Sequence, residues 1–557
     1  MNKSIFGKVY NFKLEVNNFN WSIDNEVYSF WTHSIIDATS MSSNINSLKS
    51  SIINRDIDAI VYDKKNKKLF IYKSFFSKSP IYYHSTGDSF IWSDSLPQIK
   101  SFCKNDLEIN KQALSLFFSL TYIPPPYTIY EGINKLPNNH VLILDCTELS
   151  LSVDELSDNT VSVDKNISFL EAKKQTFEKV MHSVENLNKN NFGSLLSGGV
   201  DSAVISYCFS KVSNNPIKTL SLGFENNKYD ESEAAKTVAK SINSEHYAIY
   251  LNKEETINQL DYILNLVAEP FADSSLLPSY IIAKEAKKHV SGVLTGDGGD
   301  EVFGGYNKYY IGKLNNMYTK FIPSKIHDFL LNKSELFLKK KKDVSGLTFK
   351  ANKAISSFSY KNDFYYNVIS LGFKQKDLEV LFNNAYNIGD TVFDFYKNGM
   401  PKVSTIHDFR KVDYKISLQG DMISKVYHAN KAVGLDYHSP FMNKDLWFFA
   451  NSLPENFLMK GWNKKYILKE AFKEYFPKNH FNLPKKGFGI PVGDWLRNEL
   501  KEELLTFIAI DFLEAQAIFH IAKIQEIVEN HISGKVDNSF KVWTFYCFQK
   551  WYLNNFE

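Results

Sequence analysis

The segment that most constrains the fold of this chain is residues 192–202, which read FGSLLSGGVDS. A short apolar run ends at Leu196, turns through two glycines and enters a helix-forming stretch at Asp201. Glycines let backbone N–H groups approach an anion closely, serine hydroxyls add donors, and a helix N-terminus carries partial positive charge. The segment therefore predicts a strand, a phosphate-binding loop and a helix in succession.

The surrounding sequence alternates between helical and strand-like patterns from about residue 167. Helices are predicted over 169–187, 201–212 and 231–242, and strands over 192–197, 217–224, 245–251 and 291–296. Such alternation is typical of a parallel sheet covered by helices, the usual core of a nucleotide-binding domain. Beyond residue 310 the pattern is mostly helical, and the lysine run at 339–342 indicates a solvated surface.

The N-terminal part has a different, β-rich pattern. Short apolar runs separated by polar turns predict strands within 59–63, 68–74 and 81–94, and 140–145 reads as the last strand. The prolines at 124–126 exclude a helix there. The polar stretch 151–166 is interpreted as an interdomain linker, so two domains are expected, over 1–150 and 167–557.

Charge, cysteine usage and hydropathy exclude several classes of protein. The 65 Lys and Arg and 62 Asp and Glu give a net charge of +3, without a basic stripe, which argues against a nucleic-acid binder. The four cysteines lack zinc or disulfide spacing, which fits a reducing cytoplasm. No apolar run approaches the ~18 residues needed to cross a bilayer, and no leader is recognised. A soluble cytoplasmic protein is expected.

A second motif, TGDGGDEVFGGY at 295–306, places three carboxylates within five residues. Close carboxylates repel one another and raise one another's pKa, so such a cluster indicates a metal site or proton chemistry. Asp201 beside bound phosphates likewise requires a cation, and Mg²⁺ is the usual bridge between carboxylate and phosphate oxygens. The two motifs together predict a site for a nucleotide and Mg²⁺.

The order of these motifs resembles the asparagine synthetase family of ATP pyrophosphatases. The resemblance continues through EPFADSSLLPSY at 269–280, GWNKKYILKEAF at 461–472 and LPKKGFGIPVGDWL at 483–496. It implies an α/β fold with two parts. The first is a degenerate N-terminal Ntn-hydrolase-like αββα domain, derived from a glutamine amidotransferase. The second is an adenine-nucleotide α-hydrolase-like parallel-sheet domain of the PP-loop type with a helical C-terminal region.

The resemblance also implies roles for individual residues. Residues expected to bind ATP and its pyrophosphate are Leu196, Ser197, Gly198, Gly199, Asp201, Ser202, Leu222 and Gly296. Asp201 and Asp300 match metal-binding aspartates, and Lys465 matches a lysine that stabilises charge on an acyl-adenylate. Asp297 matches an acid that accepts a proton from the attacking nitrogen, although many family members have Glu there.

The N-terminal domain departs from the family at its nucleophile. Glutamine-dependent members carry a cysteine after the initiator methionine, whereas this chain has Asn2, and its nearest cysteine is Cys103. The family's glutamine-binding strings are absent as well, and Lys73-Ser74 replaces its usual Arg-Asp. The glutaminase activity is therefore expected to be lost.

A second departure lies in KVYHANKAVGLDYHSPFMNKDL at 425–446, where acids and arginines are usual in the family. The replacements are Tyr427, His428, Asp436, His438 and Asn443. Arginine is the usual partner of a substrate carboxylate, so its loss argues against aspartate as substrate. The alternative is loss of an internal ion-pair network around an unchanged pocket. Residues assigned to the substrate pocket are Asp273, Ser274, Tyr427, His428 and His438.

The predicted activity is ATP-dependent adenylation of a small-molecule or peptide carboxylate, followed by transfer to ammonia or an amine, for which a separate protein is one candidate source. Three alternatives stay open: an asparagine synthetase using free ammonia, a cyclase like the β-lactam synthetases or lasso-peptide cyclases, and a non-catalytic pseudoenzyme. Asp297 favours ammonia-like chemistry, since those cyclases tend to lack this acid. The pseudoenzyme is least favoured because the site residues are present. Relatives often dimerise, so a homodimer is one expected state.

Overall fold

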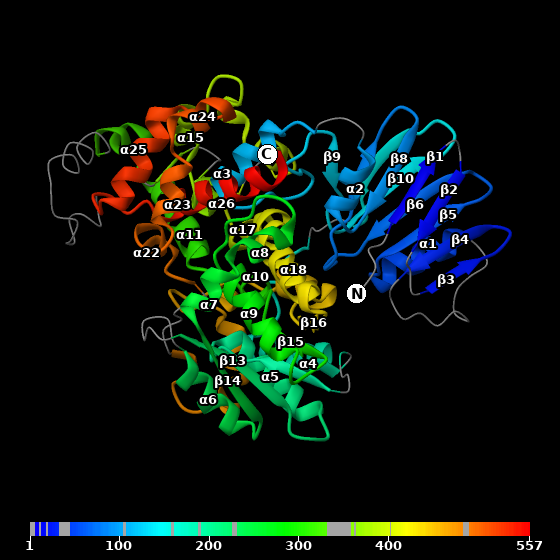
Figure 1. Cartoon of the computed structure of the whole chain (residues 1–557). Coiled ribbons are helices and arrows are strands. Elements are labelled where there is room, and N and C mark those ends of the chain that lie inside the picture. The colour runs from blue at the N-terminus through cyan, green and yellow to red at the C-terminus, as the bar shows by residue number, and fades with distance from the viewer. Residues whose placement is uncertain are drawn as a thin grey trace.

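The computed structural model describes residues 6–10, 13–17, 21–32, 45–103, 107–157, 161–185, 187, 191–224, 231–330, 358–360, 364–400, 403–482 and 489–556. Asn2, the lysine run at 339–342 and much of the predicted motif at 483–496 lie outside these residues. A mixed α/β architecture emerges, with antiparallel sheets in the N-terminal part and a parallel sheet with many helices in the rest (Figure 1). Within the described residues, every helix is too short or too polar to cross a membrane.

Two antiparallel sheets build the N-terminal part. One has the order β2-β1-β8-β7-β9, with bounds Lys13–Asn17, Phe6–Tyr10, Ser89–Ser93, Tyr82–Ser85 and Ile133–Lys135. The other has the order β11-β10-β6-β5-β4-β3, with bounds Leu151–Glu155, His140–Asp145, Lys68–Lys73, Ala59–Asp63, Tyr28–Thr32 and Trp21–Asp24. Alternate residues of both sheets, such as Val9, Ile71 and Phe90, share one apolar cluster between them.

Helix α1 (Ile45–Arg55) covers the second sheet through Leu48 and Ile52. The layering agrees with the predicted β-rich fold. The predicted linker at 151–166, however, begins with β11, which pairs antiparallel with β10 so that Leu142 faces Val153. The sequence did not predict β11 because its composition is polar. All five residues of β11 are exposed or half-buried at the edge of the sheet.

The parallel sheet has the order β14-β13-β12-β15-β16. Its strands span Glu245–Leu251, Lys218–Phe224, Phe192–Leu195, Gly292–Leu294 and Asp436–His438. Four of them match the predicted strands, whereas β16 comes from the region expected to be helical. Helices α4 (Phe169–Glu185) and α5 (Val200–Val212) pack together beside β12, and α9 (Leu276–Ala286) packs on β13 and β14 and against α18 (Ser424–Val433). The carboxyl ends of β12, β13 and β15 therefore lie at one edge of the sheet, where the described loops that follow β12 and β15 meet.

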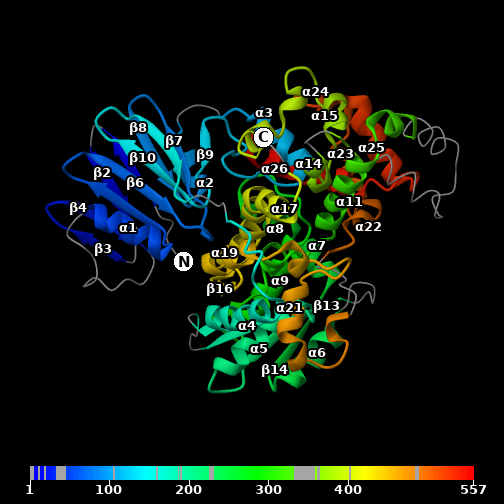
Figure 2. The same ribbon diagram turned by 180° about the vertical axis from the view of Figure 1, so that it is seen from behind.

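The two parts of the chain lie side by side, as Figure 2 shows from behind. Phe75 of the N-terminal part is fully buried, and its ring stacks on Tyr414 with 4.5 Å between centroids. The Tyr414 hydroxyl donates a hydrogen bond of 2.8 Å to the Phe75 carbonyl. Lys135 and Glu269 form a buried ion pair across the same boundary. The N-terminal part is thus joined to the rest of the chain by buried contacts.

We expect Phe75→Ala to lower the free energy of unfolding by about 3–5 kcal/mol, because it leaves a cavity at this boundary. Urea denaturation followed by tryptophan fluorescence measures the change, since Trp447 lies 6.1 Å from the Phe75 ring. Phe321→Ala is the control, because Phe321 is 72% exposed, and its loss should change stability by less than about 0.5 kcal/mol. Equal losses of stability in both variants would contradict tight packing of the N-terminal part against the rest of the chain.

Candidate active site

The predicted phosphate loop follows β12 and leads into α5. Gly198 has φ +80°, and a Cβ there would lie 2.7 Å from the Ala234 Cβ and 2.8 Å from the Ala235 nitrogen. The Ser202 hydroxyl closes the loop, since it accepts a 3.1 Å hydrogen bond from the Ser197 N–H and lies 3.0 Å from the Ser197 hydroxyl. Only glycine fits the tight turn, and the N-terminus of α5 points its partial positive charge into the loop.

Three charged side chains from distant segments meet beside this loop. Asp201 lies in the first turn of α5, Asp300 in the first turn of α10 (Gly299–Phe303), and Lys465 caps α21 (Tyr466–Phe472). The Lys465 ammonium donates to the Asp201 carboxylate and lies 2.6 Å from Asp300 Oδ1. Their side chains are only 15%, 12% and 7% exposed. This acid–lysine–acid cluster is the charged centre of the site.

Glycines make room for that cluster. A Cβ at Gly299 would lie 2.5 Å from Asp201 Oδ1, and one at Gly305 would lie 1.9 Å from Asp300 Oδ1. At Gly296 it would lie 2.7 Å from the Ser202 nitrogen. The glycines of the second motif therefore allow its backbone to approach the phosphate loop and the two carboxylates.

A cavity of about 750 Å³ opens over the cluster. The predicted site residues in its lining are Leu196, Ser197, Gly199, Asp201, Ser202, Leu222, Asp273, Ser274, Gly296, Asp297, Asp300 and Lys465. Gly198 lies behind the loop, packed on α6 (Ser232–Ser241). The structure thus brings together residues that are up to 269 positions apart in the chain, from Leu196 to Lys465.

Tyr427, His428 and His438 lie outside this lining. The Tyr427 hydroxyl donates to Asp94 Oδ2 over 3.2 Å, the His428 ring lies edge-on to the Tyr427 ring, and His438 Nδ1 is 2.9 Å from the Lys78 ammonium. For Tyr427 and His428 the reason is the phase of α18, whose neighbouring residues Val426 and Asn430 line the cavity instead, whereas His438 lies on the edge strand β16. Tyr427 and His438 therefore lie at the boundary with the N-terminal part, and His428 packs beside Tyr427.

The structure adds two residues that were not predicted. Lys425 donates to Asp273 Oδ2 over 2.6 Å and to the Ser275 hydroxyl over 2.7 Å. Although burial opposes it, the carboxylates of Asp273 and Asp421 raise the pKa of Lys425. Burial, with Asp300 and Asp413 nearby, raises the pKa of Glu301 to about 7. Glu301 was visible in its motif, whereas nothing in the sequence distinguishes Lys425 from a surface lysine.

A hydrogen bond to its backbone carbonyl fixes the position of Asp297. The Ser439 hydroxyl, one residue beyond β16, donates to the Asp297 carbonyl. The loop, the acid–lysine–acid cluster and Asp297 together provide anion-binding donors, a buried cation and a proton acceptor around one space.

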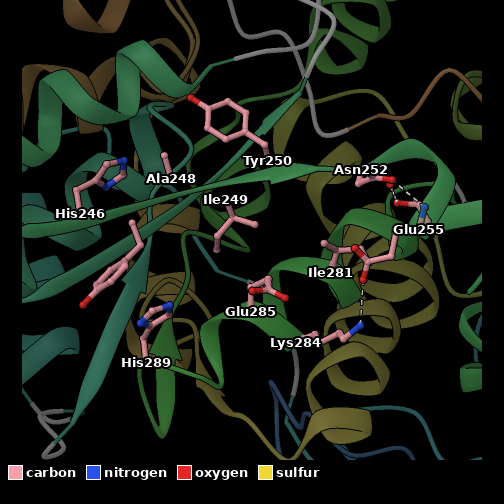
Figure 3. A pocket seen from close by; sticks show the side chains of 12 residues that line it. His246, Ala248, Ile249, Tyr250, Asn252, Glu255, Ile281, Lys284, Glu285 and His289 are labelled. Carbon is pink, nitrogen blue, oxygen red and sulfur yellow. Dashed lines mark hydrogen bonds and ion pairs between the residues drawn. The ribbon is translucent and has the colours of Figure 1, made fainter.

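A second cavity, of about 620 Å³, runs along the edge strand β14 (Figure 3). His246 faces it, but the ring nitrogens of His246 contact the hydroxyls of Thr219 at 2.9 Å and Ser221 at 3.2 Å. Lys284 pairs with Glu255 at 3.3 Å. The polar groups His246, Glu255, Lys284 and Glu285 of this second cavity already have partners, and its lining contains none of the predicted site residues. The first cavity is therefore the candidate active site.

Family models and curated proteins agree with this geometry. A model described as asparagine synthase matches residues 180–553, and one described as a glutamine amidotransferase domain matches residues 54–153. A Bacillus subtilis asparagine synthetase [glutamine-hydrolyzing] is 28% identical over 518 residues, covering 89% of this chain and 77% of the relative. A putative asparagine synthetase from Methanocaldococcus jannaschii is 34% identical over 259 residues, covering 45% of this chain and 50% of the relative.

Among solved structures, the NH3-dependent NAD synthetase of Campylobacter jejuni overlaps 37% of this chain and 98% of its own, with 14% identity and a TM-score of 0.20. The asparagine synthase model alone spans most of the chain and includes the loop, both aspartates and Lys465. The chain belongs to the asparagine synthase family and is an ATP-dependent ligase of that family.

Proposed function

We propose that this ligase adenylates the carboxylate of a substrate other than aspartate and transfers the acyl group to ammonia or an amine, without hydrolysing glutamine itself. The observation that carries the proposal is the convergence of the phosphate loop, the acid–lysine–acid cluster and Asp297 on one cavity. The carboxylate attacks the α-phosphorus, pyrophosphate leaves, and the nitrogen then displaces AMP.

Mg²⁺ fits the donor set of the cluster. Asp201 and Asp300 would supply the oxygen ligands that Mg²⁺ prefers, and glycines at 299 and 305 leave their carboxylates room. Among the described residues, no group of three or more His, Cys, Asp or Glu side chains suited to a metal occurs. When bound, Mg²⁺ neutralises phosphate charge. Lys465 then remains to stabilise charge on the acyl-adenylate.

The charges around the cavity support a substrate other than aspartate. Its described lining includes no arginine, and the buried Lys425 already holds Asp273 and Ser275. A second carboxylate on the substrate would thus lack the bidentate partner that arginine usually provides. The second candidate is amidation of aspartate by free ammonia, favoured by the relatives named asparagine synthetase.

The cysteines support the loss of glutaminase activity. Cys146, Cys208 and Cys547 are buried, Cys103 is half-buried, and burial raises the pKa of each thiol. A catalytic thiol needs the opposite shift. The nitrogen would therefore arrive as free ammonia or as an amine released by a separate protein.

ATP–pyrophosphate exchange tests the function. The purified chain would be assayed with aspartate, glutamate, hydroxy acids, sugar acids and acidic peptides, each with and without ammonium. Exchange with an acid other than aspartate supports the first candidate, and exchange with aspartate alone supports the second. No exchange with any acid would contradict both. Release of glutamate from added glutamine would overturn the proposed loss of glutaminase activity.

We expect Asp297→Asn to separate the two half-reactions. Adenylation, measured as exchange, should stay within a few-fold of wild type, because the amide preserves the shape of Asp297 and its backbone contact to Ser439. Amide formation should fall by about 100-fold or more, since the proton acceptor is lost. Product analysis by mass spectrometry measures the second step. Equal losses of adenylation and of amide formation would exclude a role of Asp297 that is restricted to the attack of the nitrogen.

A further inference from the structure

Lys469 lines the active-site cavity but lies outside the acid–lysine–acid cluster. It belongs to α21 and lies one helical turn beyond Lys465, because the Lys469 N–H donates to the Lys465 carbonyl over 2.9 Å. Residues four apart share one face of a helix. Lys465 reaches Asp201 in the first turn of α5, so this face of α21 begins beside the phosphate loop.

The other buried lysines of the cavity already face carboxylates. The Lys465 ammonium lies between Asp201 and Asp300, and Lys425 donates to Asp273. Their charges are therefore largely balanced within the protein. ATP brings several negative charges, and the β- and γ-phosphates need a positive partner besides the neutral N–H and hydroxyl donors of the loop.

The Lys469 ammonium, by contrast, has a neutral partner. It donates to the Asn463 side-chain oxygen over 3.1 Å, and no carboxylate of the described residues pairs with it. Burial and the ammonium groups of Lys465 and Lys464 lower the pKa of Lys469, while the Asp201 carboxylate opposes this shift. The half-buried Lys469 thus shares the electrostatic environment of the cluster and keeps two N–H donors beyond its bond to Asn463.

We propose that Lys469 binds the β- and γ-phosphates of ATP and holds the pyrophosphate until it leaves. A lysine acts on phosphate as a point charge and adapts to the oxygens that it meets. None of the residues predicted to bind pyrophosphate carries a positive charge, so Lys469 adds a type of contact that the loop lacks. The assignment rests on the use of ATP by the chain and is independent of which carboxylate it activates.

Calorimetric titration of the full chain with ATP, AMP and pyrophosphate tests the assignment, each with Mg²⁺ and without a carboxylate substrate. Lys469→Met should weaken the binding of ATP and of pyrophosphate by about 10- to 100-fold, because a charged hydrogen bond is lost. Binding of AMP should stay within about twofold of wild type, since AMP lacks both outer phosphates. Lys469→Arg should restore most of the affinity, because it keeps the charge.

Lys473→Met is the matched control. Lys473 lies one turn further along α21, outside the cavity lining, and its ammonium pairs with Glu470 at 2.7 Å. This variant should bind all three ligands as the wild type does. Equal weakening of ATP and AMP in Lys469→Met would overturn the proposal, as would an unchanged affinity for ATP and pyrophosphate. A wild-type chain that binds no ATP would contradict ATP use itself, and the assignment with it.

Discussion

Lys465→Met will reduce ATP–pyrophosphate exchange by about 100- to 1,000-fold, measured with whichever acid is active in the wild-type chain. The ammonium bridges the carboxylates of Asp201 and Asp300, and all three side chains are largely shielded from water. Without it, two acids face each other, and the positive charge that we propose lies beside the acyl-adenylate is gone. Lys465→Arg should retain partial activity, because it keeps the charge but not the position.

Lys464→Met is the control for this experiment. Lys464 also lines the cavity, but its ammonium donates to the Asn307 side chain over 2.8 Å instead of bridging the two aspartates. Its loss should lower exchange by less than about fivefold, because its hydrogen bond to Asn307 is exposed and lies away from the two aspartates. If both variants lose activity equally, the effect reflects general positive charge at the rim of the cavity.

The motifs of the sequence predicted most of this site because they combine residue types that are costly elsewhere. Two glycines before Asp201, and acids at 297 and 300 among further glycines, indicate phosphate and cation chemistry without any structure. The alternation of helices and strands likewise predicted the sheet up to β15. In both cases the residues that carry the signal lie close together in the sequence.

The features that were missed depend on contacts between distant segments. Strand β16 has three residues, too few for a periodic pattern, and exists because it pairs with β15, Leu294 facing His438. The placement of Tyr427 depends on which face of α18 meets the N-terminal part. Lys425 gains its importance only from Asp273, which lies 152 positions earlier. Such pairings are set by the tertiary fold and leave no local signature.

Gly305→Ala will reduce activity by about 100-fold, although the substitution adds a single methyl group. An alanine Cβ at this position would lie 1.9 Å from Asp300 Oδ1 and 2.1 Å from Lys465 Cε, so both side chains must move. Displacement of reacting groups by about 1 Å is enough for a loss of this size. Overpacking should also lower the free energy of unfolding by about 1–3 kcal/mol.

Gly489→Ala is the matched control, since Gly489 lines the same cavity and a Cβ there meets no atom of the described residues within 4 Å. Its exchange activity and melting temperature should stay close to those of the wild type. The comparison separates two explanations of the glycine-rich second motif. Loss in Gly305→Ala alone shows that glycine is required to seat Asp300 against Lys465, whereas similar loss in both variants shows that the cavity tolerates no added volume anywhere.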